Sequence, residues 1–166
     1  MRKYFFVVIA AMLAVGCIEN DPILFKDAIA EFDATVWNAP AVGVNYPIIT
    51  RVVGFGRAAT TADPLIARNT GTMNVRINLV SAQFATDQVL NISVVNGATT
   101  AVAGTHYNIP ATVTVPANSS FALLPVTIVN PVTGIGSVDL VVQIDGNETV
   151  KPSENFKRLG IRIPLN

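Results

Sequence analysis

One cysteine and one histidine limit the chemistry that this 166-residue chain can perform. A single cysteine cannot form a disulfide within the chain, and a single imidazole removes most histidine-based metal sites and proton relays. The eleven Asp and Glu residues leave a carboxylate pair for glycoside hydrolysis open, but no spacing singles out a pair. The segment Gly54-Phe55-Gly56-Arg57 lacks the third glycine and the following helical pattern of a phosphate-binding loop. We therefore expect no catalytic residue and no cofactor.

Cys17 has the sequence context of a lipid attachment site. The basic pair Arg2-Lys3 precedes an uncharged run of 12 residues, which is too short to span a hydrocarbon core of about 30 Å. The segment Leu13-Ala14-Val15-Gly16-Cys17 then resembles a bacterial lipobox. This resemblance implies that residues 1–16 are a helical lipoprotein signal peptide and that Cys17 is acylated. The alternatives are a signal peptide cleaved elsewhere and a short buried helix with a chance cysteine.

Acylation of Cys17 would attach the mature chain to a membrane. Each buried CH₂ contributes about 0.8 kcal/mol, so several acyl chains anchor a protein stably. The following Glu19, Asn20 and Asp21 resemble an export tag of surface lipoproteins, although a polar linker explains them equally well. We expect residues 17–27 to act as a tether and the protein to reside at the outer membrane or cell surface.

The mature chain has the composition of a strand-rich globular domain. Without residues 1–16 it keeps 9 basic and 11 acidic residues, a net charge of −2, which gives no electrostatic case for nucleic-acid binding. It is rich in Val, Ile and Thr and poor in Lys and Glu. β-Branched residues suit a pleated, half-buried surface, so this composition favours strands.

Alternation of apolar and polar residues predicts strands in most of the chain after residue 27. Strand-like stretches cover residues 28–37 and 47–56, and residues 57–71 form the longest expected loop. Later strands each have one apolar face, which comprises Met73, Val75, Ile77, Leu79, Leu90, Ile92, Val94, Val113, Val115, Leu124, Val126, Ile128, Val138, Leu140, Val142, Ile144, Leu159, Ile161 and Ile163. No 11-residue window has a clear helical period. We predict that residues 28–166 form an all-β, immunoglobulin-like antiparallel β-sandwich of about seven to nine strands.

Residues 99–128 resemble the Calx-beta family. The run from Ala101 to Tyr107 matches the family pattern Ala-x-x-Gly-x-Asp-Tyr, with His106 in the Asp position, and Ser153-Glu154-Asn155-Phe156 resembles the same group. The resemblance covers about residues 70–164 and includes surface lipoproteins encoded beside glycan-uptake systems. It implies structural roles: Gly104 supplies an unusual φ, His106 caps the turn, and Tyr107 packs at the sandwich edge with its hydroxyl on a backbone partner.

Calx-beta relatives in calcium exchangers bind Ca²⁺ through clustered carboxylates, and Ca²⁺ takes six to eight oxygen ligands. The comparable residues here are Asp145, Asn147, Glu148 and Glu154, and most of the family's acidic run is absent. These residues are a weak calcium candidate, because a solvated hairpin turn accounts for them. We therefore predict no metal site.

Trp37 and Tyr46 are the candidate ligand-binding residues, since they flank a loop-like stretch and an aromatic pair can stack on a sugar ring. A lone Trp near a strand end more often packs into the sandwich. The preferred hypothesis is a non-catalytic, lipid-anchored binding or scaffolding module that is accessory to glycan acquisition. The alternative is an adhesin or surface-assembly subunit that pairs strand edges with other surface proteins. A small glycan hydrolase is less favoured.

The lipid attachment is testable with Cys17→Ser. The variant should stay an unacylated precursor, because the thiol is the only group in the motif that can accept the lipid. Metabolic labelling with an alkyne fatty acid measures the outcome, and continued labelling of the variant would refute acylation at Cys17.

Overall fold

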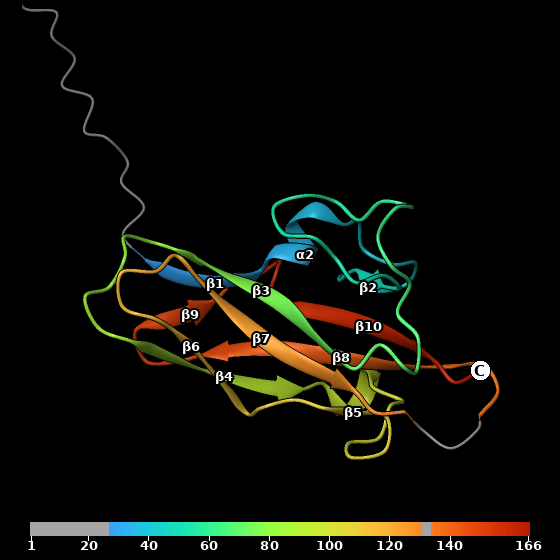
Figure 1. Cartoon of the computed structure of the whole chain (residues 1–166). Helices are drawn as coiled ribbons and strands as arrows, with labels where there is room; N and C mark the ends of the chain where they lie inside the picture. Colours follow the sequence, from blue (N-terminus) through green and yellow to red (C-terminus); the bar gives the residue numbers. More distant parts are fainter. Residues whose placement is uncertain (1–26, 131–133) are drawn as a thin grey trace, which may run out of the picture.

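The structure of the chain is a computed structural model, and it describes residues 27–130 and 134–166. Two five-stranded β-sheets pack face to face (Figure 1). The predicted signal peptide, Cys17 and all of the tether except Asp27 lie outside the described residues. No helix within the described part is long and apolar enough to cross a membrane.

The first sheet has the strand order β5-β7-β3-β1-β9, and the second has the order β2-β10-β8-β4-β6. The strands of the first sheet are β5 (Tyr107–Asn108), β7 (Phe121–Ile128), β3 (Thr72–Val80), β1 (Ala28–Phe32) and β9 (Val150–Pro152). Those of the second are β2 (Ile48–Ile49), β10 (Arg158–Pro164), β8 (Ser137–Gly146), β4 (Gln88–Val94) and β6 (Thr112–Val115). The predicted all-β sandwich is confirmed. Two pairings are parallel, however: β1 with β9 and β10 with β2.

The hydrophobic core lies between the two inner sheet faces. The apolar faces predicted from the alternation point inward, and β3 shows the pattern most clearly, because its odd-numbered residues are buried and its even-numbered residues are more exposed. Side chains with no exposed surface include Phe32, Ile77, Leu90, Leu124, Leu140, Ile144, Leu159, Ile161 and Ile163. Full burial of each such side chain stabilises the fold by about 1.5–3 kcal/mol.

Three local predictions were wrong. The strand expected over residues 28–37 ends at Phe32, because Asp33–Trp37 forms the short helix α2, in which the Thr35 hydroxyl donates to the Phe32 carbonyl at 2.6 Å. The strand expected over residues 47–56 is reduced to β2. The alternation in β8 puts Val141 opposite the predicted apolar face of Leu140 and Val142, yet Val141 is buried too, since the 3₁₀-helix η1 (Asn96–Ala98) packs against β8.

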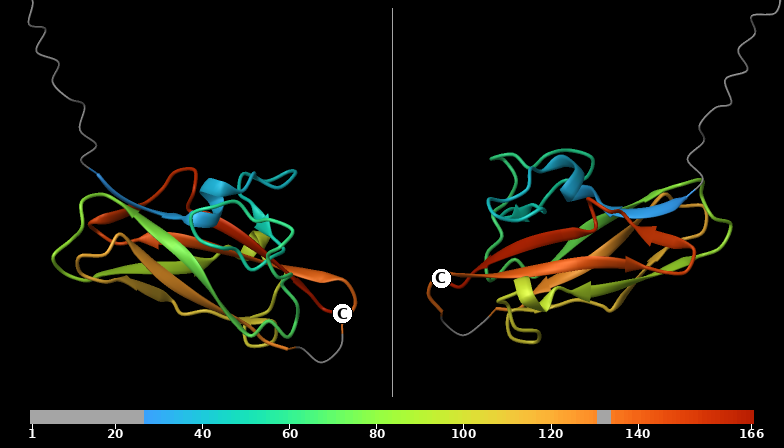
Figure 2. Two further views of the ribbon diagram at one scale, coloured as in Figure 1. Left: turned by 45° about the horizontal axis from the view of Figure 1, so that its top comes forward. Right: turned by 180° about the vertical axis from the view of Figure 1, so that it is seen from behind.

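The two ends of the sandwich carry different segments, as the two views in Figure 2 show. β1 begins at the end that also holds the connection from β3 to β4 and the turn between β8 and β9. The C-terminus and the turn before β5 lie at the opposite end. A tether that precedes β1 therefore leaves from the end opposite the C-terminus.

Gly146→Ala should destabilise the protein by at least about 2 kcal/mol. Gly146 has a φ of +75°, and an added Cβ would lie 2.3 Å from the Val150 carbonyl oxygen in the turn between β8 and β9. Gly97→Ala is the matched control, because a Cβ there meets nothing within 4 Å. Urea unfolding measures both variants, and equal free energies of unfolding would contradict this account.

Candidate functional site

Large exposed apolar side chains gather in the segment between β1 and β3. Half of those found in the described residues lie between positions 36 and 65, namely Val36, Trp37, Val42, Val44, Phe55 and Leu65. Figure 1 shows α2, β2 and their loops gathered over one side of the sandwich. We call residues 33–71 the lobe. Clustered exposed apolar side chains mark surfaces that meet a ligand or partner, so the lobe is the first place to look for a site.

The Asp33 carboxylate joins the lobe to the first sheet. It is only 4% exposed, and it accepts hydrogen bonds from the Gly56 backbone N–H at 2.7 Å and from Asn78 Nδ2 at 2.9 Å. The indole Nε1 of Trp37 donates to the same carboxylate at 3.3 Å. A buried carboxylate is costly unless hydrogen bonds satisfy it. These three donors come from α2, from the loop at Gly56 and from β3. Asp33 therefore fixes all three segments relative to one another.

Trp37 and Phe55 are the exposed aromatic side chains that this carboxylate organises. The Trp37 side chain is 48% exposed although its indole N–H is bound, and Phe55, next to Gly56, is 45% exposed. Tyr46, the predicted partner of Trp37, is only 6% exposed, so its ring is not part of this surface. The residue before the Asp33-bound Gly56 is Phe55, and it is exposed whereas Tyr46 is buried.

The polar network continues across the outer face of the first sheet. Arg76 Nε donates to Asn78 Oδ1 at 2.8 Å, and the Arg76 guanidinium lies 4.4 Å from the centre of the Phe121 ring. We call Trp37, Asp33, Asn78, Arg76 and Phe121 the Trp37–Phe121 row. The row extends from α2 through β3 to β7, with a half-exposed aromatic ring at each end and hydrogen-bonding groups between them.

Glu31 adds a carboxyl group to this surface. It pairs across the strands with Asn78, and burial, followed by the nearby charge of Asp33, raises the pKa of Glu31. The surface therefore combines the carboxyl group of Glu31 with the amide of Asn78 and the guanidinium of Arg76. Such groups match the alternating donors and acceptors of a hydroxyl-rich ligand.

A second carboxylate, Asp63, orders the far part of the lobe. Arg57 Nη1 donates to Asp63 Oδ2 at 2.8 Å and the Thr60 backbone N–H donates to the same oxygen at 2.7 Å. The hydrogen bonds from Arg57 and then from Thr60 hold the pKa of Asp63 well below its usual range. Arg51 Nη1 also donates to the Asp63 carbonyl at 2.6 Å. The expected long loop over residues 57–71 is therefore braced by side-chain hydrogen bonds.

The turn that resembled the Calx-beta pattern lies before β5, at the end of the sandwich that holds the C-terminus. Gly104 has a φ of +75°, and the Val102 backbone N–H donates to Nδ1 of His106 at 2.8 Å, so His106 caps the turn. Tyr107 is 6% exposed and packs in the core. Within residues 27–130 and 134–166 its hydroxyl has no hydrogen-bond partner, so the expected backbone partner is not found.

Of the four weak calcium candidates, Asn147 serves a turn. Asn147 Oδ1 accepts from the backbone N–H groups of Thr149 and Val150, in the turn between β8 and β9. Asp145 accepts from Gln143, exposed Glu148 lies in the same turn, and Glu154 lies 4.0 Å from Lys157 in the turn before β10. Within the described part of the chain, no three His, Cys, Asp or Glu residues are grouped to hold a metal ion.

Of the residues in this surface, sequence reasoning named only Trp37; it missed Asp33, Asn78, Arg76, Phe121 and Glu31, and it also missed the exposed Phe55. One available signal was the i, i+4 spacing of Asp33 and Trp37, which brings two side chains together on a helix. No local signal existed for Phe55. Its position depends on the backbone N–H of the next residue, Gly56, which donates to the Asp33 carboxylate 23 residues away.

The family model described as "Domain of unknown function (DUF4843)" matches residues 66–163. Among solved structures, the calcium binding domain CBD12 of CALX1.1 is 15% identical with a TM-score of 0.49, and covers 60% of this chain and 40% of its own. The apo-form Calx CBD1 domain is 15% identical with a TM-score of 0.46, and the match covers 59% of this chain and 87% of that domain. WR4, an MSP family member of C. elegans, is 12% identical with a TM-score of 0.31, and the match covers 61% of this chain and 91% of WR4. This chain thus spans about two-fifths of the CBD12 structure. No curated protein matches in sequence.

Asp63→Asn and Glu31→Gln should change the pH dependence of stability in opposite directions. The pKa of Asp63 is lowered from 3.8 in the folded protein, so its carboxylate stabilises the fold above that pH and the stabilisation is lost as the pH falls. The pKa of Glu31 is raised from 4.5, so its ionisation destabilises the fold as the pH rises. At pH 7 we expect a lower Tm for Asp63→Asn and a slightly higher Tm for Glu31→Gln.

Thermal unfolding at pH 7 and at about pH 3 measures both effects. Both differences from the parent protein should shrink at the lower pH. Glu31 is then protonated in the folded parent, and proton uptake by Asp63 in the unfolded chain removes part of the stabilisation that its lowered pKa provides. Differences of the same sign at pH 7, or differences that do not depend on pH, would contradict the assignment.

Proposed function

Because the chain belongs to the family described as a domain of unknown function (DUF4843), we propose its function from its own surface. The protein is a non-catalytic module that binds glycans along the Trp37–Phe121 row. One observation carries the proposal. The Trp37 indole N–H is fixed by buried Asp33 while nearly half of the side chain is exposed. A ring held in this way offers a flat apolar surface whose orientation is set before any ligand arrives.

A sugar ring presents both chemistries that the row offers. Its C–H face can stack on an aromatic ring, and its hydroxyl groups can donate to Glu31 and accept from Asn78 and Arg76. The hydrogen bonds among Arg76, Asn78 and Asp33 hold these groups in place. Preorganised groups lose less conformational freedom on binding, so more of the interaction energy appears as affinity.

We further propose that acylated Cys17 anchors the protein at the outer membrane or cell surface, where it serves glycan acquisition. The lipobox-like segment before Cys17 and the resemblance of residues 101–107 to surface lipoproteins support this proposal. β1 begins at one end of the sandwich, so an anchor before it would hold that end toward the membrane. The Trp37–Phe121 row lies on a side face of the sandwich and would stay accessible to extracellular glycans.

Trp37→Ala should weaken glycan binding by about 2 kcal/mol, which is roughly a thirty-fold rise in Kd, because exposed Trp side chains are common binding hot spots. Screening the purified protein on a glycan array identifies a ligand, and calorimetry with that glycan measures the Kd of the variant. Trp37→Phe should retain part of the affinity, because it keeps a ring but loses the hydrogen bond to Asp33.

Val42→Ala is the matched control, since Val42 is a fully exposed apolar residue of the same lobe. It should bind the glycan as the parent protein does. Circular dichroism checks that each variant keeps its fold. If no glycan on a broad array binds, or if Trp37→Ala binds as tightly as the parent, the proposed function is wrong.

A further inference from the structure

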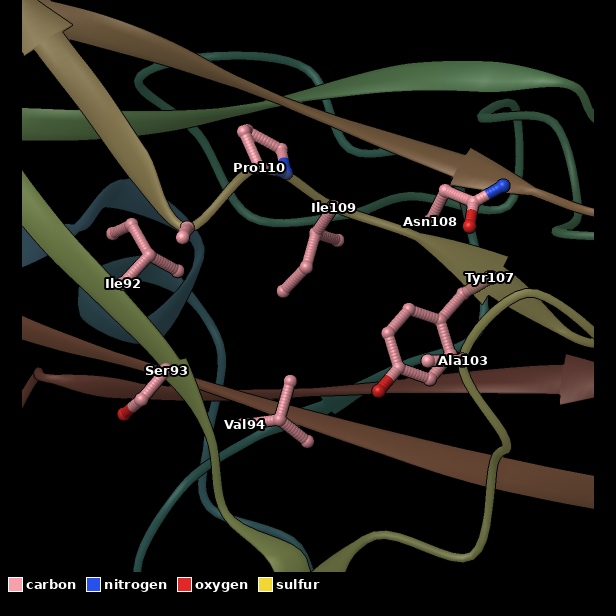
Figure 3. A pocket seen from close by; sticks show the side chains of 9 residues that line it. Ile92, Ser93, Val94, Ala103, Tyr107, Asn108, Ile109 and Pro110 are labelled. Atoms are coloured by element: carbon pink, nitrogen blue, oxygen red, sulfur yellow. The ribbon is translucent and has the colours of Figure 1, made fainter.

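A hollow of about 260 Å³ opens between β4 and the segment that links β5 to β6. Figure 3 shows that the side chains of Val94 and Ile109 and the ring of Tyr107 converge on it. Ala103 and Pro110 also line the hollow. None of these residues belongs to the Trp37–Phe121 row, so the hollow is independent of the proposed glycan surface.

The hollow exists because β4 loses its outer neighbour partway along its length. β6 pairs with β4 only from Gln88 to Asn91, and the next contact is the Ile92 backbone N–H, which donates to the Ala111 carbonyl at 2.8 Å. The residues that precede Ala111 in the chain form β5, and β5 belongs to the other sheet, where it pairs with β7. Beyond Ile92, the outer edge of β4 is therefore left without a strand beside it.

The hydrogen-bonding pattern shows which backbone groups face this gap. The Ile92 N–H points toward β6, whereas the Val95 N–H points the other way and donates to the Val141 carbonyl of β8 at 2.9 Å. In an antiparallel strand these directions alternate, so the N–H and C=O of Val94 point to the same side as the N–H of Ile92. Neither group makes a hydrogen bond within the part of the chain that the structure describes.

Tyr107 adds one polar group to the wall of the hollow. Its hydroxyl makes no hydrogen bond with the described residues, and a phenol is protonated at neutral pH, so it can donate. Burial raises the pKa of Tyr107 further. The side chains of Val94 and Ile109, by contrast, are apolar and partly buried. The site therefore presents an unpaired strand edge, a phenol donor and an apolar cavity together.

We propose that this hollow binds an extended peptide, which pairs with β4 at Val94 and inserts one apolar side chain between Ile109 and Tyr107. A strand edge with a free N–H and C=O on one residue is complementary to the backbone of another strand, and a side-chain pocket beside it selects the residue that enters. The volume suits one large apolar side chain. The hydroxyl of Tyr107 would donate to a carbonyl of the same peptide.

The probe for this proposal is the capped pentapeptide acetyl-Thr-Val-Leu-Val-Thr-amide, added to the ¹⁵N-labelled protein. We expect saturable chemical-shift changes centred on the amides of Val94 and Tyr107. A peptide with N-methylated leucine cannot donate to the Val94 carbonyl, and it should bind about tenfold more weakly.

Ala103→Leu tests the cavity by filling it. It should abolish the shift changes, whereas Val102→Leu, at the neighbouring position that is 54% exposed, should leave them intact. The proposal is overturned if the peptide causes no saturable change at Val94, if the N-methylated peptide binds equally well, or if Ala103→Leu binds as the parent does. None of these outcomes bears on the glycan surface, because Trp37 is not involved.

Discussion

Packing between two apolar sheet faces holds this domain together, because a chain with one cysteine cannot form an internal disulfide. The inner faces are filled by Leu, Ile, Val and Phe side chains from both sheets, so the core alone must offset the conformational entropy of the chain. Because the apolar side chains fill the inner faces, the outer faces of both sheets can carry polar and aromatic groups. The Trp37–Phe121 row lies on an outer face, whereas the open edge of β4 borders the core at Val94, Ile109 and Tyr107.

The strands from residue 72 onward could be predicted because each has one buried face. Alternation such as that of Met73, Val75 and Ile77 reports burial directly, and those side chains are buried in the structure. The lobe could not be predicted in the same way. Its shape depends on hydrogen bonds of Asp33 and Asp63 with backbone groups distant in sequence, and such contacts leave no period in the chain. The parallel pairings of β1 with β9 and of β10 with β2 also join residues more than 100 positions apart.

The same distinction separates the site residues. The turn with Gly104 and His106 is local, and its geometry follows from a few adjacent residues. Trp37 was recognisable as an aromatic side chain near a loop, but its link to β3 and β7 runs through Asp33, Asn78 and Arg76, which are distant in sequence. The hollow beside Tyr107 arises where a chain segment crosses from one sheet to the other, and this crossing becomes visible only when the strand pairing is known.

The position of β1 has a mechanical consequence. β1 is the first strand after the tether, yet it lies inside its sheet, between β3 and β9. If the chain is anchored through Cys17 and pulled through a ligand on the Trp37–Phe121 row, β1 is the first strand in the path of the force. Its hydrogen bonds lie on both sides of the strand, so both ladders must break before β1 can leave the sheet. A strand at the sheet edge has only one ladder to carry such a load, so the interior position of β1 makes the start of the domain harder to pull away.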